Sequence, residues 1–317
     1  MEGKTLGVVG TGLIGASILR AVETRSLGWT TIAFDTDEQA LAVVRENGWA
    51  SRICTQIDEM ASADLIVVCA PPRDVARIVV GLAGVISTDS IITDVASTKG
   101  QIVADVFSVV RQDFPFIPGH PMAGSERSGP GSSNALLFEG RPCLLTPAPS
   151  APQRAIAAAS SFWRSIGAET HLISATAHDR IVGLTSHLPH LLVFALSEVV
   201  GAEVGLSTAL TPFVGKGLVD TIRIGHAHPV MWKDIFRDNK EELLKWLGRF
   251  EEVLGDWRQL ILAEDPDGLM SAIRIAKDRA GVIVESQKNV GVGSASSHRF
   301  DVMSPNSSTL VPASTPP

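Results

Sequence analysis

The sequence predicts an α/β domain built on a doubly wound parallel sheet, followed by an all-α domain. Residues 1–174 alternate short, β-branched apolar runs with segments of helical periodicity, whereas residues 175–290 contain helical patterns alone. Strands that are apolar throughout and separated by helices are typical of a parallel sheet covered on both faces. A chain of 317 residues is also long enough for two domains.

The strands of the first domain can be assigned in order along the chain. The expected strands are "TLGVVG", "TTIAFD", "ADLIVVCA" and "SIITDVAS", each followed by a helical pattern. "PFIPGH" is expected to be the last parallel strand, ending at Gly119-His120-Pro121. A strand "PCLLTPA", a helix "APQRAIAAASSFWRSIG" and a strand "AETHLIS" complete the domain. Because parallel strands end at one edge of the sheet, a ligand is expected beyond those ends.

The second domain is predicted to contain three long helical segments, over residues 178–201, 232–265 and 267–287. The stripe "LLKWLGRFEEVLGDWRQLIL" is more apolar than a single exposed helix tolerates. It forms either a dimer interface or the core of the monomer, and the sequence leaves both open. Residues 291–317 are rich in Ser, Pro and Gly, which predicts a disordered tail.

Composition excludes several classes of partner. The formal net charge is −7 and no block of Lys or Arg occurs, which argues against nucleic acid and anionic membrane surfaces. The three cysteines, Cys54, Cys69 and Cys143, form no CxxC motif, as expected of reduced thiols in a cytoplasmic protein. We find no signal-peptide pattern and expect no membrane-spanning segment of about 20 apolar residues.

The run "VVGTGLIG" matches a dinucleotide-binding fingerprint of the Rossmann type. Its glycines have the spacing G-x-G-x-x-G, a strand precedes them and a helix follows. The first glycine allows a tight turn, the second lets the backbone approach a pyrophosphate, and the third lets the helix pack on the strand. The predicted cofactor-binding residues of this loop are Gly10, Thr11, Gly12, Leu13, Ile14 and Gly15.

The acidic residue Asp35 indicates which dinucleotide binds. It stands twenty positions after Gly15, at the end of the second strand, where a carboxylate accepts hydrogen bonds from the adenosine ribose. A carboxylate there repels a 2′-phosphate, and no Arg follows to hold one. NAD is therefore predicted rather than NADP. Ala70 and Pro71, at the end of the third strand, are expected beside the nicotinamide ribose.

His120 is expected at the cofactor crevice of the first domain. Pro121 restricts it to an extended conformation, which directs its side chain toward the cofactor crevice. Ser97 also follows a strand. It is either the N-cap of the next helix or a hydrogen-bond partner that holds a histidine ring. The roles of Glu126 and Arg127, in the turn after His120, remain open.

The second domain contributes a histidine-rich segment, "HDRIVGLTSHLPH". Pro189 within it leaves the carbonyl of Thr185 without a helical partner and is expected to kink the chain. His187 and His190 stand three residues apart, but no Cys or carboxylate lies at helical spacing beside them, so no metal site is predicted.

Arg223, in the apolar stretch "GLVDTIRIG", is expected to be buried and therefore to need an anionic partner. That partner is either Asp220, three residues earlier, or the carboxylate of a substrate held by two hydrogen bonds.

Six segments together resemble the prephenate/arogenate dehydrogenase family of tyrosine biosynthesis, across about residues 6–285. They are "GTGLIG", "DVASTKG", "GHPMAGSERSG", "LFEGRPCLLTP", "HDRIVGLTSHLPH" and "DTIRIG", in this order. The resemblance implies a Rossmann domain followed by a helical domain that forms an intertwined homodimer. It makes His120 the catalytic histidine and Ser97 the serine that positions it. It also implies that Arg223, His190 and His178 bind substrate.

The implied reaction is an NAD-dependent oxidative decarboxylation of prephenate, in the cytoplasm. Arogenate, or both compounds, is the alternative substrate, and 4-amino-4-deoxyprephenate ranks third because it lacks the 4-hydroxyl that His120 would deprotonate. A hydroxyacid dehydrogenase that uses Lys216 is a competing enzyme class, although this lysine is expected at the surface. A non-catalytic NAD sensor would not need a base and a carboxylate clamp.

Overall fold

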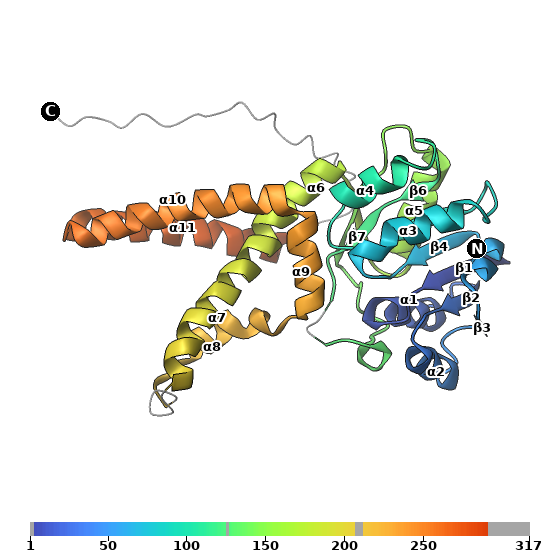
Figure 1. The fold of residues 1–317 in the computed structure, drawn as a ribbon, viewed down its shortest axis with the longest axis horizontal. Helices are drawn as coiled ribbons and strands as arrows, with labels where there is room; N and C mark the ends of the chain where they lie inside the picture. Colours follow the sequence, from blue (N-terminus) through green and yellow to red (C-terminus); the bar gives the residue numbers. More distant parts are fainter. Residues whose placement is uncertain (1–2, 125–126, 207–211, 291–317) are drawn as a thin grey trace.

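The computed structural model describes residues 3–124, 127–206 and 212–290. Its N-terminal part is built on a parallel sheet with the strand order β3-β2-β1-β4-β5-β6 (Figure 1). This is the order of a doubly wound dinucleotide-binding fold, as predicted. The strands are β1 (Lys4–Val9), β2 (Trp29–Phe34), β3 (Arg52–Ile53), β4 (Leu65–Val68), β5 (Ile91–Asp94) and β6 (Phe116–Ile117).

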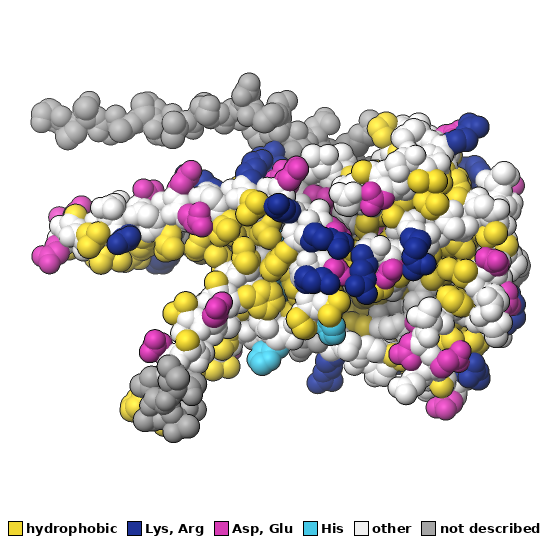
Figure 2. Space-filling model, viewed as in Figure 1, with side chains coloured by type: hydrophobic (Ala, Val, Ile, Leu, Met, Phe, Trp, Pro, Cys, Tyr) yellow, Lys and Arg dark blue, Asp and Glu magenta, His cyan; other side chains and the backbone are white. Residues whose placement is uncertain are grey.

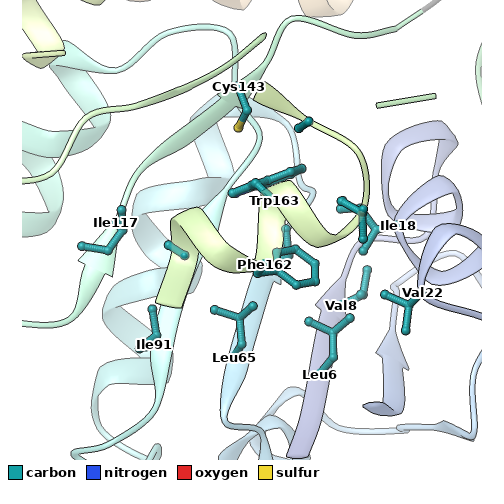
Figure 3. Packing of buried hydrophobic residues seen from close by; sticks show 14 of the residues in the cluster. Leu6, Val8, Ile18, Val22, Leu65, Ile91, Ile117, Cys143, Phe162 and Trp163 are labelled. Carbon is teal, nitrogen blue, oxygen red and sulfur yellow. The ribbon is translucent and has the colours of Figure 1, made fainter. Parts of the chain in front are cut away.

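Helices cover both faces of this sheet because its strands are apolar on both sides. Successive residues of β4 alternate between two hydrophobic clusters: Leu65 and Val67 face α1 and α5, whereas Ile66 and Val68 face α3 and α4. Figure 3 shows the first cluster, in which Phe162 and Trp163 of α5 pack over the sheet. The helices are α1 (Leu13–Thr24), α2 (Glu38–Glu46), α3 (Pro72–Ala83), α4 (Gly100–Phe107) and α5 (Gln153–Ser165), with short 3₁₀ turns at Ile57–Ser62 and Pro130–Ser132.

A second, three-stranded sheet changes the position predicted for His120. β7 (Gly119–Pro121) pairs antiparallel with β8 (Pro142–Leu145), which pairs parallel with β9 (Glu169–Leu172). The prediction that His120 ends the last parallel strand is therefore wrong. The parallel strand β6 ends at Ile117, and Pro118, which has no N–H to donate, separates it from β7. His120 instead lies in the middle of β7, opposite Leu144 of β8.

From Ala175 onward the described residues form helices, as predicted. They are α6 (Ala175–Val182), a π-helical turn (Gly183–His187), α7 (Leu188–Leu206), α8 (Lys216–Ile222), a 3₁₀ turn (Arg223–His226), α9 (Pro229–Asp238), α10 (Lys240–Leu262) and α11 (Pro266–Val290). Pro189 was expected to kink the chain, and the π-helical turn Gly183–His187 ends two residues before it. The single helix expected over 232–265 is wrong, because Asn239, with φ −112° and ψ 32°, separates α9 from α10.

The helices of the second part project from the first as two arms, α7 with α8 and α10 with α11 (Figure 1). Hydrophobic side chains line the faces of the arms that flank the gap between them (Figure 2). Leu243 is the buried residue of α10, whereas Leu244, Leu254 and Ile261 are more than half exposed. The alternative that the apolar stripe of α10 forms the monomer core is therefore wrong.

One helical stretch, residues 175–203, is long and apolar enough to span a membrane by length and composition, with a mean hydropathy of 1.2. The expectation that the chain holds no such segment is thus not met by this criterion. The stretch includes His178, Asp179 and His187, which are buried against other elements of the protein.

Candidate active site

The glycine loop has the shape that a dinucleotide requires. Gly10 has φ +95°, and a Cβ there would lie 2.5 Å from the carbonyl oxygen of Cys69. A Cβ on Gly15 would lie 1.9 Å from the carbonyl oxygen of Gly10, so helix α1 can pack here only without a side chain. Gly12, in contrast, faces open space. The two outer glycines shape the loop, and the middle one leaves room for a pyrophosphate.

Asp35 lies directly after β2 and is bound to the glycine loop. Its Oδ2 accepts hydrogen bonds from the backbone N–H and from the hydroxyl of Thr11, the latter at 3.0 Å. Its Oδ1 accepts from the N–H of Asp37 at 2.9 Å. The carboxylate is therefore fixed at the end of the strand, which is where an acidic residue recognises the ribose of NAD in this fold.

A cavity of about 480 Å³ joins the glycine loop to the second part of the chain. The predicted cofactor residues Gly12, Leu13, Ile14, Ala70 and Pro71 line one side, and Ser97, His120 and Arg127 continue the wall. α9 and the residue pair before it close the other side through Ala227, His228, Val230, Met231 and Asp234. A ligand bound here would thus lie between the Rossmann sheet and the helical part.

His120 is the first member of a hydrogen-bonded chain that crosses between the two parts. Its Nδ1 lies 2.8 Å from Nε2 of His178 on α6, and Nδ1 of His178 lies 2.7 Å from Oδ1 of Asp179. His178 is 0% exposed, and His120 and Asp179 are also buried. The sequence assigned His178 to the substrate, but the structure places it behind His120.

Asp179 also caps a helix of the other part. Its carboxylate accepts from the backbone N–H of Lys99 at 2.9 Å and of Gly100 at 2.7 Å, at the N-terminus of α4. A carboxylate at a helix N-terminus satisfies unpaired N–H groups and interacts favourably with the helix dipole. The cap of α4 is supplied across the domain boundary, so the N-cap role considered for Ser97 is wrong.

The direction of these hydrogen bonds fixes the tautomer of His120. Asp179 already accepts two backbone N–H groups, and an ionised carboxylate accepts only, so Nδ1 of His178 donates to it. Nε2 of a neutral His178 then accepts from Nδ1–H of His120. The remaining nitrogen of His120, Nε2, therefore carries a lone pair, which is the requirement for a base.

The surroundings keep the members of this chain in the states just described. Burial, followed by charge repulsion from His178, Lys99 and His187, holds the pKa of His120 well below its usual value of 6.5. Burial also lowers the pKa of His178. Burial alone would raise the pKa of Asp179, but hydrogen bonds from His178 and the α4 backbone outweigh it and lower that pKa. His120 and His178 are neutral and Asp179 is ionised near pH 7.

A buried ion pair contacts both ends of the hydrogen-bonded chain formed by His120, His178 and Asp179. Nζ of Lys99 donates to Oδ2 of Asp94 at 2.5 Å, and both side chains are 0% exposed. Oδ1 of Asp94 accepts from the N–H of Gly119, the residue before His120, at 3.0 Å. Because the N–H of Lys99 binds Asp179, the pair connects the strand of His120 to the helix that carries His178.

The remaining predicted substrate residues, His190 and Arg223, are not among the residues that line the cavity. His190 donates from Nδ1 to the carbonyl oxygen of Ser186 at 2.9 Å and stacks on Trp232, with ring centroids 3.8 Å apart. Arg223 is exposed at the start of the 3₁₀ turn, so the expectation that it is buried is wrong. Lys216 is exposed, as expected. Ser97 lines the cavity, but the partner of the His120 ring is His178. Glu126 lies outside the described residues.

Four residues of the site were missed from the sequence: Asp94, Lys99, Asp179 and Asn239. Asn239 donates from Nδ2 to the carbonyl oxygen of Asp179 and to Nδ1 of His187, the latter at 3.0 Å. Two of the four had a signal in the sequence. Asp179 directly follows a histidine assigned to the site, and Lys99 is a cation next to the end of an apolar strand.

The fold and the site define a class of protein, a two-domain dehydrogenase with a dinucleotide-binding domain and a helical domain that share one cavity. The family comparison is more specific. Residues 19–172 match the nucleotide-binding domain of prephenate dehydrogenase, and residues 174–275 match the prephenate dehydrogenase dimerization domain. The chain belongs to the prephenate dehydrogenase family. The glycine loop precedes the matched span, so its assignment rests on the geometry above.

Individual relatives support this assignment. A cyclohexadienyl dehydrogenase of Zymomonas mobilis is 32% identical over 84% of this chain and 92% of its own length. The crystal structure of an Aquifex aeolicus prephenate dehydrogenase with hydroxyphenyl propionate and NAD+ is similar with a TM-score of 0.82 and 28% identity, over 89% of this chain and 99% of that one. A Synechocystis arogenate dehydrogenase has a TM-score of 0.75 and 26% identity, over 88% and 99%.

Proposed function

We propose that this protein oxidatively decarboxylates prephenate to 4-hydroxyphenylpyruvate with NAD, with arogenate, or both compounds, as the alternative substrate. The observation that carries the proposal is the chain from Asp179 through His178 to His120, which presents a neutral imidazole to the cavity beside the glycine loop. The names of the relatives support this class of substrate, since they include prephenate, arogenate and cyclohexadienyl dehydrogenases.

NAD supplies the hydride acceptor of this reaction when it is bound. Gly12 leaves space for its pyrophosphate, Leu13, Ile14, Ala70 and Pro71 line its place in the cavity, and Asp35 would accept from its adenosine ribose. The buried Thr11 holds Asp35 for that task. Selection of NAD over NADP follows from the negative charge at Asp35.

His120 is the proposed general base. Its Nε2 takes the proton of the ring 4-hydroxyl while the hydride leaves C4, which turns C4–OH into C4=O. The bond to the ring carboxylate then breaks and releases CO2, its electron pair makes the ring aromatic, and the phenol oxygen takes the proton back. Aromatisation drives the reaction, so the protein has to orient the ring and position one base. His178 and Asp179 keep the lone pair of His120 on the reacting nitrogen.

Arg223 and His190 are proposed to bind the carboxylates of the substrate, and Ser97 to help position His120. The support for these roles is the match to the family motifs together with the position of Ser97 on the cavity wall. Arg223 is exposed in the single chain, and a second chain packed against the arms would cover part of this surface.

We further propose that the protein is a cytoplasmic homodimer and that residues 175–203 form part of its interface rather than a membrane span. A dimerization-domain match and the exposed apolar faces of α7, α10 and α11 support the dimer. A membrane span would place His178, Asp179 and His187 in hydrocarbon, where ionisable groups are costly. We propose domain limits of 1–174 and 175–290, and a disordered 291–317, which lies outside the described residues.

The test is NADH formation by the purified protein with prephenate and with arogenate, each with NAD and with NADP. We expect turnover with NAD on at least one of the two substrates and a much weaker response to NADP. Binding of NAD without turnover of either compound would instead support the NAD-sensor alternative. Turnover of simple 3-hydroxyacids would support another dehydrogenase class.

A further inference from the structure

Asp94 is the last residue of β5, and its buried carboxylate accepts three hydrogen bonds. Oδ1 accepts from the backbone N–H of Gly119 at 3.0 Å. Oδ2 accepts from the backbone N–H of Ala96 at 3.0 Å and from Nζ of Lys99 at 2.5 Å. The side chains of Asp94 and Lys99 are both 0% exposed. The carboxylate thus joins the end of β5 to β7 and to the residue that precedes α4.

These contacts close a ring of hydrogen bonds behind the proposed base. From Asp94 the ring passes through Lys99, whose backbone N–H donates to Asp179 at 2.9 Å. Asp179 accepts from Nδ1 of His178 at 2.7 Å, and Nε2 of His178 lies 2.8 Å from Nδ1 of His120. The peptide bond that precedes His120 leads back to Asp94. All five side chains are buried, so bulk water cannot replace a lost contact.

Asp94 also holds the cavity wall beside His120. The three residues that follow it, Val95, Ala96 and Ser97, line the cavity on the Rossmann side. The carboxylate that accepts from Ala96 is the same one that holds the strand of His120. One buried group therefore sets the position of the base relative to this wall. A misplacement of about 1 Å in such an arrangement can lower a rate by about 100-fold.

We propose that Asp94 is a positioning residue, which holds Nε2 of His120 where the ring hydroxyl of the substrate gives up its proton. The inference rests on the proposed function, in which His120 is the base. Asp94 is 0% exposed and does not line the cavity, so it touches neither substrate nor cofactor. It acts through the N–H of Gly119 on one side and through Lys99 and Asp179 on the other. Loss of its charge therefore slows the chemical step and leaves ligand binding intact.

The experiment compares the wild type with Asp94→Asn, which keeps an oxygen for the N–H of Gly119 and removes the charge that pairs with Lys99. Single-turnover formation of NADH is followed with enzyme in excess over prephenate or arogenate and with saturating NAD. We expect the rate constant to fall by about 10–100-fold, while KM for the substrate and the calorimetric affinity for NAD stay near the wild-type values. A smaller folded fraction leaves this rate constant unchanged, so a fall reports on the position of the base. An unchanged rate constant, or a loss confined to ligand binding, overturns the proposal.

Asp64→Asn is the matched control. Asp64 precedes β4, at the opposite edge of the same sheet, and its Oδ2 accepts from the backbone N–H of Thr5 at 2.7 Å. This variant also removes a carboxylate that holds a neighbouring strand, but Asp64 does not line the cavity and its rate constant should equal that of the wild type. An equal fall in both variants overturns the proposal. If the wild type turns over neither prephenate nor arogenate, the proposed function itself fails, a result distinct from an unchanged rate constant in Asp94→Asn.

A double variant covers the case in which Asp94→Asn does not fold. Asp94→Asn alone leaves the buried ammonium of Lys99 without its partner, which is destabilising. Adding Lys99→Met removes the second charge and should restore resistance to urea. We expect the single-turnover rate constant of the double variant to stay at least about tenfold below the wild-type value, because the ring remains open between residues 94 and 99. Recovery of both the stability and the rate constant would show that the ion pair only stabilises the fold, and would overturn the proposal.

Discussion

The Rossmann part and the helical arms bury their apolar residues in opposite ways. In the first, whole strands and helix faces are buried, as in Leu65 to Val68 of β4, each at most 3% exposed. In the arms, 23 residues of α10 contain one buried side chain, and Val282 and Ile283 of α11 are 67% and 65% exposed. One part thus has a core of its own, whereas the other presents apolar surface that a partner must cover.

The difference explains why the site lies between the two parts. The dinucleotide loop needs a rigid sheet, which the Rossmann part provides. The proposed base His120 has a second histidine and a carboxylate behind it, and both come from α6 at the root of the arms. Asp179 caps α4, and this contact fixes the position of α6 relative to the Rossmann part. The predictions below separate what each part contributes.

The largest effect on turnover is expected at His120, where the two parts meet. His120→Asn removes the proposed base and should lower kcat by about 10²–10⁴-fold, while NAD affinity stays near the wild-type value because the glycine loop is untouched. Steady-state NADH formation and calorimetric NAD titration measure the two quantities. Unchanged turnover would remove His120 from the role of base.

Acid should weaken the fold through the helical part. The pKa of His187 is about 4 because burial disfavours its charge, against an ordinary value of 6.5. The unfolded chain therefore takes up a proton first as the pH falls, so the stability contributed by neutral His187 is full above pH 6.5 and is lost between 6.5 and 4. The expected loss is about 3 kcal/mol for this residue.

Urea unfolding at a series of pH values measures this dependence. His187→Gln keeps an acceptor for Asn239 and should flatten the curve, whereas His226→Gln, at an exposed position, should not. A curve of the same slope in His187→Gln would assign the acid sensitivity to other groups, such as the buried His120 and His178.

A charged side chain introduced on the arms should weaken the dimer without disturbing the core of the Rossmann part. Ile283→Glu places a carboxylate on the apolar face of α11, and we expect the dimer dissociation constant to rise by about 30-fold or more. Val109→Glu is the matched control, since Val109 is 67% exposed in the Rossmann part. Sedimentation velocity over a dilution series compares them. Equal dissociation constants would argue against α11 as the interface.

Gly100→Ala tests the contact between the parts. A Cβ at this position would lie 2.7 Å from Oδ2 of Asp179, so the carboxylate must move away from α4. We expect kcat to fall about tenfold with little change in NAD affinity, because His178 loses its fixed partner. Gly81→Ala, where a Cβ meets open space, should behave as the wild type. If both variants match the wild type, the cap does not position His120.

The smallest effect is expected at Arg223. Because the side chain is exposed, Arg223→Ala should raise KM for the substrate by about fivefold, the scale of a solvated ion pair, and leave kcat and NAD affinity unchanged. A rise beyond about 100-fold would show that the site desolvates Arg223 on assembly or binding. An equal loss for NAD and for substrate would mark Arg223 as structural.

Particular residues show how far the sequence leads. The glycine spacing and Asp35 were readable because a dinucleotide imposes them locally, within one strand, one turn and one helix. Pro121 indicated that His120 is extended, and the resemblance of its segment to a family motif indicated its role. Asp94 and Asn239 were not readable, because their partners stand far away in the chain, as Gly119 does from Asp94 and Asp179 from Asn239. The pairing of β7 with β8 was missed for the same reason.

The sequence by itself determined the alternation of strands and helices in the first part, the helical character of the second and the dinucleotide loop. These features follow from periodicity and from backbone restrictions that act over a few residues. Tertiary structure alone decided that His178 lies behind His120 and that Asp179 caps a helix of the other part. Such contacts join residues distant in sequence, and only packing brings their side chains within hydrogen-bonding distance.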